Sequence, residues 1–279
     1  MSLAPRGALR YHLLAPLRRI RAAWREREFR AVPRVPADTR ALGRVAPDRL
    51  AALLAPTGPV AAQWAEDERT VAALGLPEMT GGVNPGDQRA LHALVLGLRP
   101  SAILEVGTHI GCSTVSLALA ARRVGAHILS CDVADVNDET RRPWVRYGSP
   151  KAPRALLEQA GCGSVVEFRT ADSLVFLRSS GPEFDLIFLD GDHSAGTVYR
   201  ELAAACVVLR PGGCIVLHDY FSDNRPLFAN DPAISGPYLA VERLREEGAA
   251  LSVQPFGALP WRTRVGSHMT TLAVVSSAE

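Results

Sequence analysis

Phe184-Asp-Leu-Ile-Phe-Leu-Asp-Gly-Asp-His193 is an apolar run that ends abruptly in ionisable side chains. Its composition is that of a buried strand, and Asp190, Asp192 and His193 follow where that strand would reach the edge of its sheet. The segment Cys214-Ile-Val-Leu-His-Asp219 repeats the pattern further along the chain. Two neighbouring strands of this kind would aim carboxylates at one spot. The sequence therefore predicts a site that does chemistry.

On both sides of this stretch, strand and helix patterns alternate. Apolar runs predict strands at 101–106, 126–131, 164–169, 184–189 and 213–218, and periodic segments between them predict helices at 112–123, 151–160, 172–179 and 195–208. This rhythm favours an α/β fold with a parallel sheet covered on both faces. The tail adds a helix at 238–247 and strands at 250–254 and 270–275, with proline and glycine between them indicating a hairpin-like return.

The rest of the chain suggests three regions: a basic arm and linker at 1–36, a helical N-terminal extension or cap at 37–98, and the alternating domain at 99–279. The extension contains helical patterns near 47–55, 59–75 and 87–98. With 279 residues, the chain is long enough for one large domain with extensions.

The composition indicates whether the chain spans a membrane and in which compartment it is expected. No span of eighteen uncharged apolar residues exists, so no transmembrane helix is expected. The cysteines are odd in number and have no C-x-x-C pair, which favours free, buried thiols in a reducing compartment, and hence a cytoplasmic protein. They are Cys112, Cys131, Cys162, Cys206 and Cys214.

Positive charge is concentrated at the amino terminus. Residues 1–36 hold nine arginines against Glu26 and Glu28, a net charge of about +7, although the whole chain carries only +2. Apolar residues from Leu9 to Trp24 recur at helical spacing between these arginines. One interpretation is that residues 1–30 contact an anionic membrane surface or an acidic protein. The alternative is an arm that packs on its own domain or on a second subunit of a homo-oligomer.

A glycine-rich turn follows the first predicted strand. In Glu105-Val-Gly-Thr-His-Ile-Gly111, the glycines allow a tight turn and close approach to a ligand, but the spacing is not the G-x-G-x-x-G of dinucleotide sites. An acid before the turn disfavours a phosphate and can accept from an ammonium group. Asp132, at the end of the second strand, has the spacing of a ribose-binding acid or of a cap, and Asp172 could accept from an adenine amino group or cap the next helix.

Taken together, these segments resemble the class I S-adenosylmethionine-dependent methyltransferases, in the branch of the catechol, caffeoyl-CoA and sugar O-methyltransferases. The resemblance covers about residues 80–276 and rests on E-V-G-T-x-x-G-x-S-T, F-D-L-I-F-L-D-G-D-H-S and L-R-P-G-G-C-I-V-L-H-D-Y in that order. It implies a Rossmann-like sheet of seven strands with the last antiparallel, and S-adenosylmethionine as cofactor. The residues it implies for the cofactor are Glu105, Gly107, Thr108, Gly111, Ser113, Asp132, Asp172, Ser173 and Asp190.

The resemblance also implies a divalent metal, Mg²⁺ or another, held by Asp190 and Asp219. The third ligand departs from the pattern: the catechol-type enzymes have Asn where this chain has Tyr220, and the sugar-type enzymes have an acid where it has His218. Because imidazole suits Zn²⁺, Mn²⁺ or Fe²⁺ better than Mg²⁺, either His218 binds a different metal, or water fills the third position, or no metal binds.

The catalytic base has two candidates. His193 stands where the catechol-type enzymes carry lysine, and an unperturbed imidazole pKa of about 6.5 suits proton removal near neutral pH. Asp192 matches the base of the sugar-type enzymes. We expect these two residues to act as base and orienter in one order or the other. The alternative is that His193 caps the helix that begins at Ser194.

These observations predict an O-methyltransferase that acts on a hydroxyl of a small molecule: a sugar, a phenolic or a polyketide-like natural product. One alternative is a non-catalytic or repurposed S-adenosylmethionine-binding protein. Another is an NAD-dependent oxidoreductase, which the missing G-x-G-x-x-G argues against. Nucleic acid is not an expected partner, because the basic charge is confined to the arm.

Overall fold

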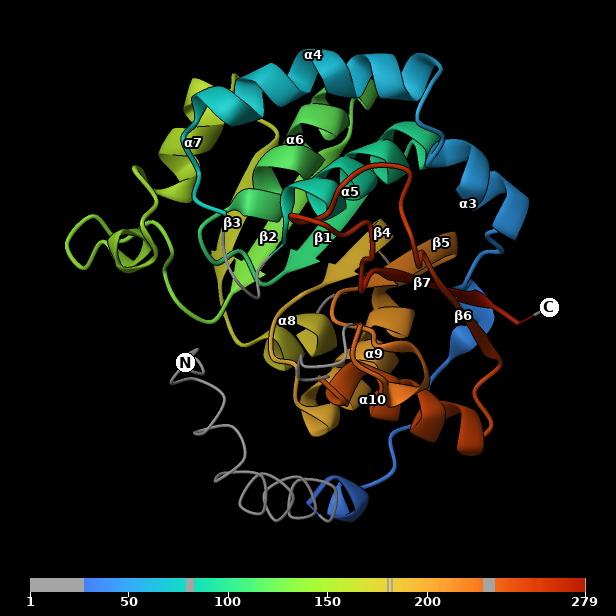
Figure 1. The fold of residues 1–279 in the computed structure, drawn as a ribbon. Coiled ribbons are helices and arrows are strands. Elements are labelled where there is room, and N and C mark those ends of the chain that lie inside the picture. The colour runs from blue at the N-terminus through green and yellow to red at the C-terminus, as the bar shows by residue number, and fades with distance from the viewer. Residues whose placement is uncertain (1–27, 79–82, 180, 182, 228–233, 279) are drawn as a thin grey trace, which may run out of the picture. The chain divides into compact units, whose positions relative to one another are not determined.

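The computed structural model describes residues 28–78, 83–179, 181, 183–227 and 234–278 (Figure 1). The chain forms two compact units, residues 1–35 and 36–279, and each is considered by itself. Of the first unit only residues 28–35 are described, so most of the expected basic arm lies outside the described residues. Everything below concerns the second unit.

The second unit is built on one sheet of seven strands in the order β3-β2-β1-β4-β5-β7-β6. The strands from β3 to β5 are parallel, whereas β7 is antiparallel to both β5 and β6. This confirms the predicted Rossmann-like sheet with its last strand antiparallel. The strands are β1 Ala102–Val106, β2 His127–Asp132, β3 Val166–Thr170, β4 Phe184–Leu189, β5 Leu209–Leu217, β6 Leu251–Pro255 and β7 Ala273–Ser277.

Helices cover both faces of the sheet. In Figure 1, α4, α5, α6 and α7 lie over one face, and α8, α9 and α10 lie over the other. Neighbouring helices pack directly within each layer, α5 on α6 and α9 on α10 most extensively. The helices are α3 Pro47–Leu53, α4 Pro59–Ala73, α5 Pro85–Leu98, α6 Cys112–Val124, α7 Pro153–Gln159, α8 Ser173–Ser179, α9 Ala195–Val208 and α10 Gly236–Glu246, with short 3-10 turns at Thr39–Ala41, Pro143–Tyr147 and Ser222–Asn224.

Strand register decides where the polar strand ends meet. Val106 of β1 pairs with Leu189 of β4, and Leu189 in turn pairs with Leu217 of β5. All three side chains are buried, as expected for parallel strands covered on both faces. The residues that follow them therefore emerge at one edge of the sheet.

The strand expected at 213–218 begins earlier, at Leu209, and contains Pro211-Gly-Gly213. A register irregularity between Phe184 and Leu186 of β4 accompanies this early start. Gly213 is needed there, since a Cβ at this position would lie 2.7 Å from the Asp185 carbonyl oxygen. Proline and glycine look like loop residues in the sequence, and only the pairing with β4 brings them into the strand.

Two expectations from composition can be compared with the structure. All five cysteines are free and buried. Across the described ranges, no helix combines the length and apolarity needed to cross a membrane.

Candidate functional site

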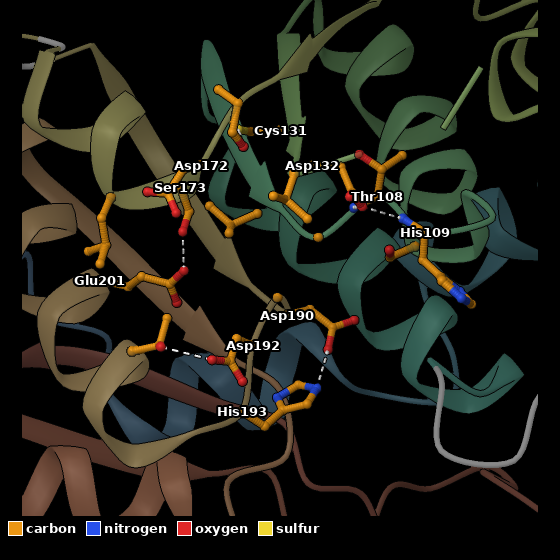
Figure 2. Close-up of a pocket in the computed structure, with 18 of the residues that line it drawn as sticks. Thr108, His109, Cys131, Asp132, Asp172, Ser173, Asp190, Asp192, His193 and Glu201 are labelled. Atoms are coloured by element: carbon orange, nitrogen blue, oxygen red, sulfur yellow. Dashed lines mark hydrogen bonds and ion pairs between the residues drawn. The ribbon is translucent and has the colours of Figure 1, made fainter. Parts of the chain in front are cut away.

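A cleft of about 790 Å³ opens at the carboxyl ends of the central strands (Figure 2). It extends from the end of β1 to the loops after β2, β3 and β4. Most of the residues implied for the cofactor line it, although they come from four separate segments of the chain. Those lining residues are Gly107, Thr108, Ser113, Asp132, Asp172, Ser173 and Asp190.

The glycine turn after β1 depends on its two glycines. Gly107 has φ +97°, and a Cβ there would lie 2.2 Å from the Asp190 carbonyl oxygen. Gly111 has φ +85° and caps the start of α6. Only glycine adopts such backbone angles without cost while allowing this close approach. Gly107 therefore lets the ends of β1 and β4 touch, whereas Gly111 itself lies outside the cleft wall.

Glu105 lies behind the turn rather than on the cleft wall. Its side chain is completely buried and accepts hydrogen bonds from Ser113 Oγ at 2.6 Å, Thr114 Oγ1 at 2.6 Å and Ser130 Oγ at 2.5 Å. Burial raises the pKa of this carboxyl to about 7, against the opposing effect of the three hydroxyl donors. In this structure Glu105 supports the turn from behind, and its expected contact with the cofactor stays a prediction.

Asp132 ends β2 and holds the other side of the turn. Its Oδ2 accepts from the backbone amides of Thr108 at 3.1 Å and His109 at 3.0 Å, and its Oδ1 accepts from the Ala134 amide at 3.0 Å. His109 occupies the left-handed region with φ +51°, an unusual conformation for a non-glycine residue. The Asp132 carboxylate stabilises that conformation while lining the cleft.

Asp172 and Ser173 form the far wall at the start of α8. Asp172 Oδ1 accepts from the Val175 amide at 3.0 Å, so this residue does cap the helix while lining the cleft. The Ser173 hydroxyl donates to Glu201 Oε1 of α9, as Figure 2 shows. Glu201 also lines the cleft, and its burial raises the pKa of its carboxyl to about 7.

The expected pairing of Asp192 with His193 is not formed. The Asp192 carboxylate instead accepts from Ser194 and Thr197 at the start of α9, with hydroxyl contacts of 2.8 Å each. Burial opposes ionisation, but the hydrogen bonds from Thr197 and Ser194 outweigh it and lower the pKa of Asp192. The reason is local: a short acid before Ser194 satisfies free amides and hydroxyls at a helix start.

His193 faces different acids. Its Nε2 lies 3.5 Å from Asp219 Oδ2 and 3.8 Å from Asp190 Oδ1, and its side chain is 29% exposed at the cleft wall. Figure 2 shows the ring turned towards Asp190. Asp219 itself has φ +54°, a strained conformation of the kind that concentrates at functional sites. The imidazole is therefore both reachable and adjacent to carboxylates.

Behind His193 lies a buried group of four side chains, which we call the His218 cluster: Asp87, Asp190, His218 and Asp219. His218 Nδ1 lies 2.9 Å from Asp190 Oδ1 and 3.6 Å from Asp219 Oδ1, and Nε2 lies 3.5 Å from Asp87 Oδ2. The contact with Asp190 is an ion pair rather than an aligned hydrogen bond. Burial disfavours the imidazolium, but the charge of Asp190 and the other carboxylates raises the pKa of His218 well above its ordinary value.

The metal group expected at Asp190, Asp219 and His218 is not formed in this arrangement. Within the described ranges, no three or more His, Cys, Asp or Glu side chains are placed so as to hold a metal ion. The physical reason lies in His218, whose ring nitrogens both face carboxylates of the cluster. A metal ligand would need to turn a free lone pair to the ion instead.

Sequence patterns missed two residues of this region. Asp87 was expected only as the start of a helix, and it does belong to the Asn84 cap of α5, but it also reaches His218. No local sequence pattern predicts that contact, because it joins α5 to the end of β5. Glu201 had a signal: it is the one acid within α9, and seven apolar residues, Leu202–Val208, follow it.

Comparisons with known proteins agree with this geometry. A family model described as a methyltransferase domain matches residues 104–220. The catechol O-methyltransferase of Niastella koreensis is 29% identical over 176 residues, which cover 60% of this chain and 71% of that protein. The residues matched by the family model contain the glycine turn, most of the cleft wall and the ends of β4 and β5.

Solved structures agree on the fold. A putative O-methyltransferase from Klebsiella pneumoniae has a TM-score of 0.51 and 23% identity, over 83% of this chain and 96% of its own. An O-methyltransferase from Bacillus cereus, solved in complex with SAH, has a TM-score of 0.51 and 24% identity, over 82% and 96%. The sheet order, the glycine turn and the matched methyltransferase domain together support a class I S-adenosylmethionine-dependent O-methyltransferase.

Proposed function

We propose that this protein binds S-adenosylmethionine in the cleft and methylates a hydroxyl group of a small molecule, with His193 as the catalytic base. The observation that carries the proposal is the position of His193: a partly exposed imidazole on the wall of the cleft, beside the carboxylates of Asp190 and Asp219. The glycine turn and the acids after β2 and β3 line the other end of the same cleft.

The chemistry of the cleft suits the cofactor. Asp132 has one carboxylate oxygen with a single amide donor, which leaves it able to accept from ribose hydroxyls. Asp172 and Ser173 lie where an adenine edge would be recognised. Gly107, Thr108 and Ser113 would meet the methionine end, with Glu105 stabilising the turn from behind. Gly111 would shape the turn without touching the cofactor.

When bound, S-adenosylmethionine supplies a methyl group on a positively charged sulfur. The protein has to align an acceptor oxygen with that methyl group and remove the acceptor's proton. The imidazole of His193 can take this proton, and Asp219, 3.5 Å from Nε2, stabilises the imidazolium that results. The acceptor oxygen forms a bond to carbon, and the electrons of the broken carbon–sulfur bond stay on sulfur, so the reaction balances without another reactant.

Asp192 has a smaller part in this proposal. Its carboxylate is occupied by Ser194 and Thr197, and its lowered pKa makes it a weak base near neutral pH. We assign it the role of fixing the loop that presents His193. A divalent metal is left out of the mechanism, because the side chains expected to hold one are arranged around His218 instead.

The name of one relative supports a choice of acceptor class to test first. The matched protein from Niastella koreensis is named a catechol O-methyltransferase, which supports a phenolic acceptor as the first to test. Sugars and polyketide-like compounds with free hydroxyls are the next classes. In each case the reactive group is a hydroxyl that reaches His193.

Calorimetry tests the cofactor, and a panel of acceptors tests the reaction. We expect the full chain to bind S-adenosylmethionine and S-adenosylhomocysteine, and to methylate at least one hydroxylated acceptor. A chain that binds NAD tightly and binds neither S-adenosylmethionine nor S-adenosylhomocysteine would contradict the proposal. Cofactor binding with no turnover on any phenol, sugar or polyketide would favour the non-catalytic alternative.

A further inference from the structure

A second hollow lies at the opposite edge of the sheet from the cleft. Its volume is about 270 Å³, and its walls include residues at the starts of β1, β4 and β5, whereas the cleft opens at the carboxyl ends of the strands. We call it the arginine pocket, because three arginines line it: Arg44, Arg49 and Arg99. None of the residues that line the cleft lines this pocket.

The three arginines reach the pocket from separate segments of the chain. The Gly43 amide donates to the Gly213 carbonyl oxygen at 2.6 Å, which fixes the segment before α3 against β5 and brings Arg44 to the pocket. Arg49 belongs to α3, and Arg99 caps the carboxyl end of α5. The packing of the helical extension on the sheet therefore gathers these side chains, although no sequence motif joins them.

The arginines of the pocket have no acidic partners. Within the described ranges, Arg44, Arg49 and Arg99 form no ion pair with a carboxylate, and all three are exposed. Like charges that are gathered in this way repel one another, and an anion bound among them would remove that repulsion. The pocket is thus suited to a negatively charged ligand.

The acid in the pocket wall, Asp185, does not neutralise these arginines. Its Oδ2 accepts from the Ser101 amide at 2.8 Å, the Ser101 hydroxyl at 2.7 Å and the Ala102 amide at 2.9 Å, and Arg210 Nη1 lies 3.2 Å away. Burial disfavours its ionisation, but these hydrogen bonds and the charge of Arg210 lower the pKa of Asp185. Because Asp185 is paired with Arg210, the charges of the three pocket arginines remain uncompensated.

The charge of the surrounding unit makes this group of arginines unusual. Residues 37–279 carry a net charge of about −5, because the whole chain carries +2 and residues 1–36 carry about +7. A cluster of positive charge on an otherwise acidic unit is therefore not explained by the charge of its surroundings. Such a cluster would attract an anion to one place on the surface.

We propose that the arginine pocket binds the phosphate group of a small phosphorylated molecule. Guanidinium groups match the oxygens of phosphate with paired donors, and a phosphate monoester carries a charge of about −1.5 to −2 at pH 7. Drug-sized ligands occupy pockets of about 300–1,000 Å³, so a hollow of about 270 Å³ suits a phosphate with a small substituent. This binding site is additional to the proposed methyl-transfer site.

The test is calorimetric titration of glycerol 3-phosphate into the full chain, in buffer free of phosphate and sulfate. We expect one equivalent to bind, and glycerol, which lacks the phosphate, not to bind. Arg44→Gln/Arg99→Gln removes two guanidinium groups from the pocket and should weaken binding at least about tenfold. The matched control is Arg18→Gln/Arg19→Gln, which removes the same charge from the basic arm and should leave the affinity unchanged.

Thermal unfolding gives a second readout and shows whether each variant folds. Because a ligand that binds the folded chain raises its Tm, glycerol 3-phosphate should raise the Tm of wild type and of the arm control, and should not raise that of the pocket variant. No saturable binding to wild type would overturn the proposal. An equal loss of affinity in both double variants would also overturn it, because general positive charge would then explain the binding.

Vesicles that contain phosphatidic acid distinguish a free phosphate from a lipid headgroup. Vesicle binding that is lost in Arg44→Gln/Arg99→Gln, together with no binding of glycerol 3-phosphate, would overturn the assignment to a small molecule. Titration of S-adenosylhomocysteine into the same samples reports on the cleft. Because the two sites lie at opposite edges of the sheet, failure of either proposal leaves the other standing.

Discussion

His193 Nε2 lies 3.5 Å from Asp219 Oδ2, although the two residues follow different strands of the sheet. The pairing of β4 with β5 creates this contact, because Leu189 and Leu217 are register partners and each is followed by part of the site. A base and the acid that stabilises its protonated form are thereby brought together without being neighbours in the sequence. The mechanism proposed here depends on that contact.

Replacing the base should impair turnover and leave cofactor binding intact. We expect His193→Gln to lower kcat roughly 100- to 10,000-fold, the usual contribution of a general base, with S-adenosylhomocysteine affinity within about twofold of wild type. Steady-state kinetics and calorimetry measure the two quantities. His268→Gln, a change at a histidine whose Nδ1 contacts the Leu259 carbonyl oxygen at 3.0 Å, is the control. Wild-type kcat in His193→Gln would remove the histidine from the mechanism.

Asp132 should control cofactor affinity. In Asp132→Ala the turn loses its contacts with the Thr108 and His109 amides, and under the proposed function the ribose would lose its acceptor. We therefore expect affinity for S-adenosylhomocysteine to fall about 10- to 100-fold. Asp135→Ala, which removes an exposed acid from the same loop, should change it little. Equal affinities in both variants, measured by calorimetry, would argue against a ribose site at Asp132.

Glu201 should make stability depend on pH. Its folded-state pKa of about 7 lies above the ordinary value of 4.5, so its favourable contribution is complete below about pH 4.5 and is lost as pH rises through 7. Glu201→Gln should therefore be more stable than wild type at pH 8 by at most about 3 kcal/mol, and the difference should shrink towards pH 5. Urea unfolding at several pH values measures this difference.

An exposed acid serves as the control for this experiment. Glu139 is exposed on the loop after β2. Glu139→Gln should therefore change the free energy of unfolding by the same amount at pH 5 and at pH 8. A stability difference for Glu201→Gln that stays constant over the same range would show that the carboxyl does not titrate there.

Gly236 should be intolerant of a side chain. A Cβ at this first residue of α10 would lie 1.8 Å from the His193 carbonyl oxygen, so Gly236→Ala must displace the loop that presents the base. We expect a loss of about 1–3 kcal/mol in unfolding free energy and a fall in kcat larger than any change in cofactor affinity. Gly181→Ala, where a Cβ meets nothing within 4 Å, is the matched control. Parallel losses of kcat in both variants would contradict the steric argument.

The fold was predictable because its signals are local. The predicted strands 101–106, 126–131, 184–189 and 213–218 are mostly apolar and are followed directly by glycine or an acid. β4 has the predicted bounds of Phe184–Leu189. The start of β5 was not predictable, since Pro211-Gly-Gly213 joins the strand only through pairing with β4. In the sequence, proline and glycine indicate a turn and so hide the start of the strand. In the structure, pairing with β4 holds the same residues in the strand.

The sequence predicted which side chains would lie close together at the strand ends. It did not predict which of them would contact each other. Asp190, His193 and Asp219 do converge. His193 contacts Asp190 and Asp219 rather than the expected Asp192, whose carboxylate accepts from Ser194 at the start of a helix. The contact between Asp87 and His218 crosses from α5 to the end of β5, and no spacing in the chain encodes it.

The most direct test of the central claim is transfer of a trideuterated methyl group from labelled S-adenosylmethionine to a catechol or sugar acceptor, followed by mass spectrometry. We predict that wild-type protein places the label on an acceptor oxygen and that His193→Gln places almost none in the same time. Label that appears on carbon or nitrogen, or at the same rate in both proteins, would contradict the account.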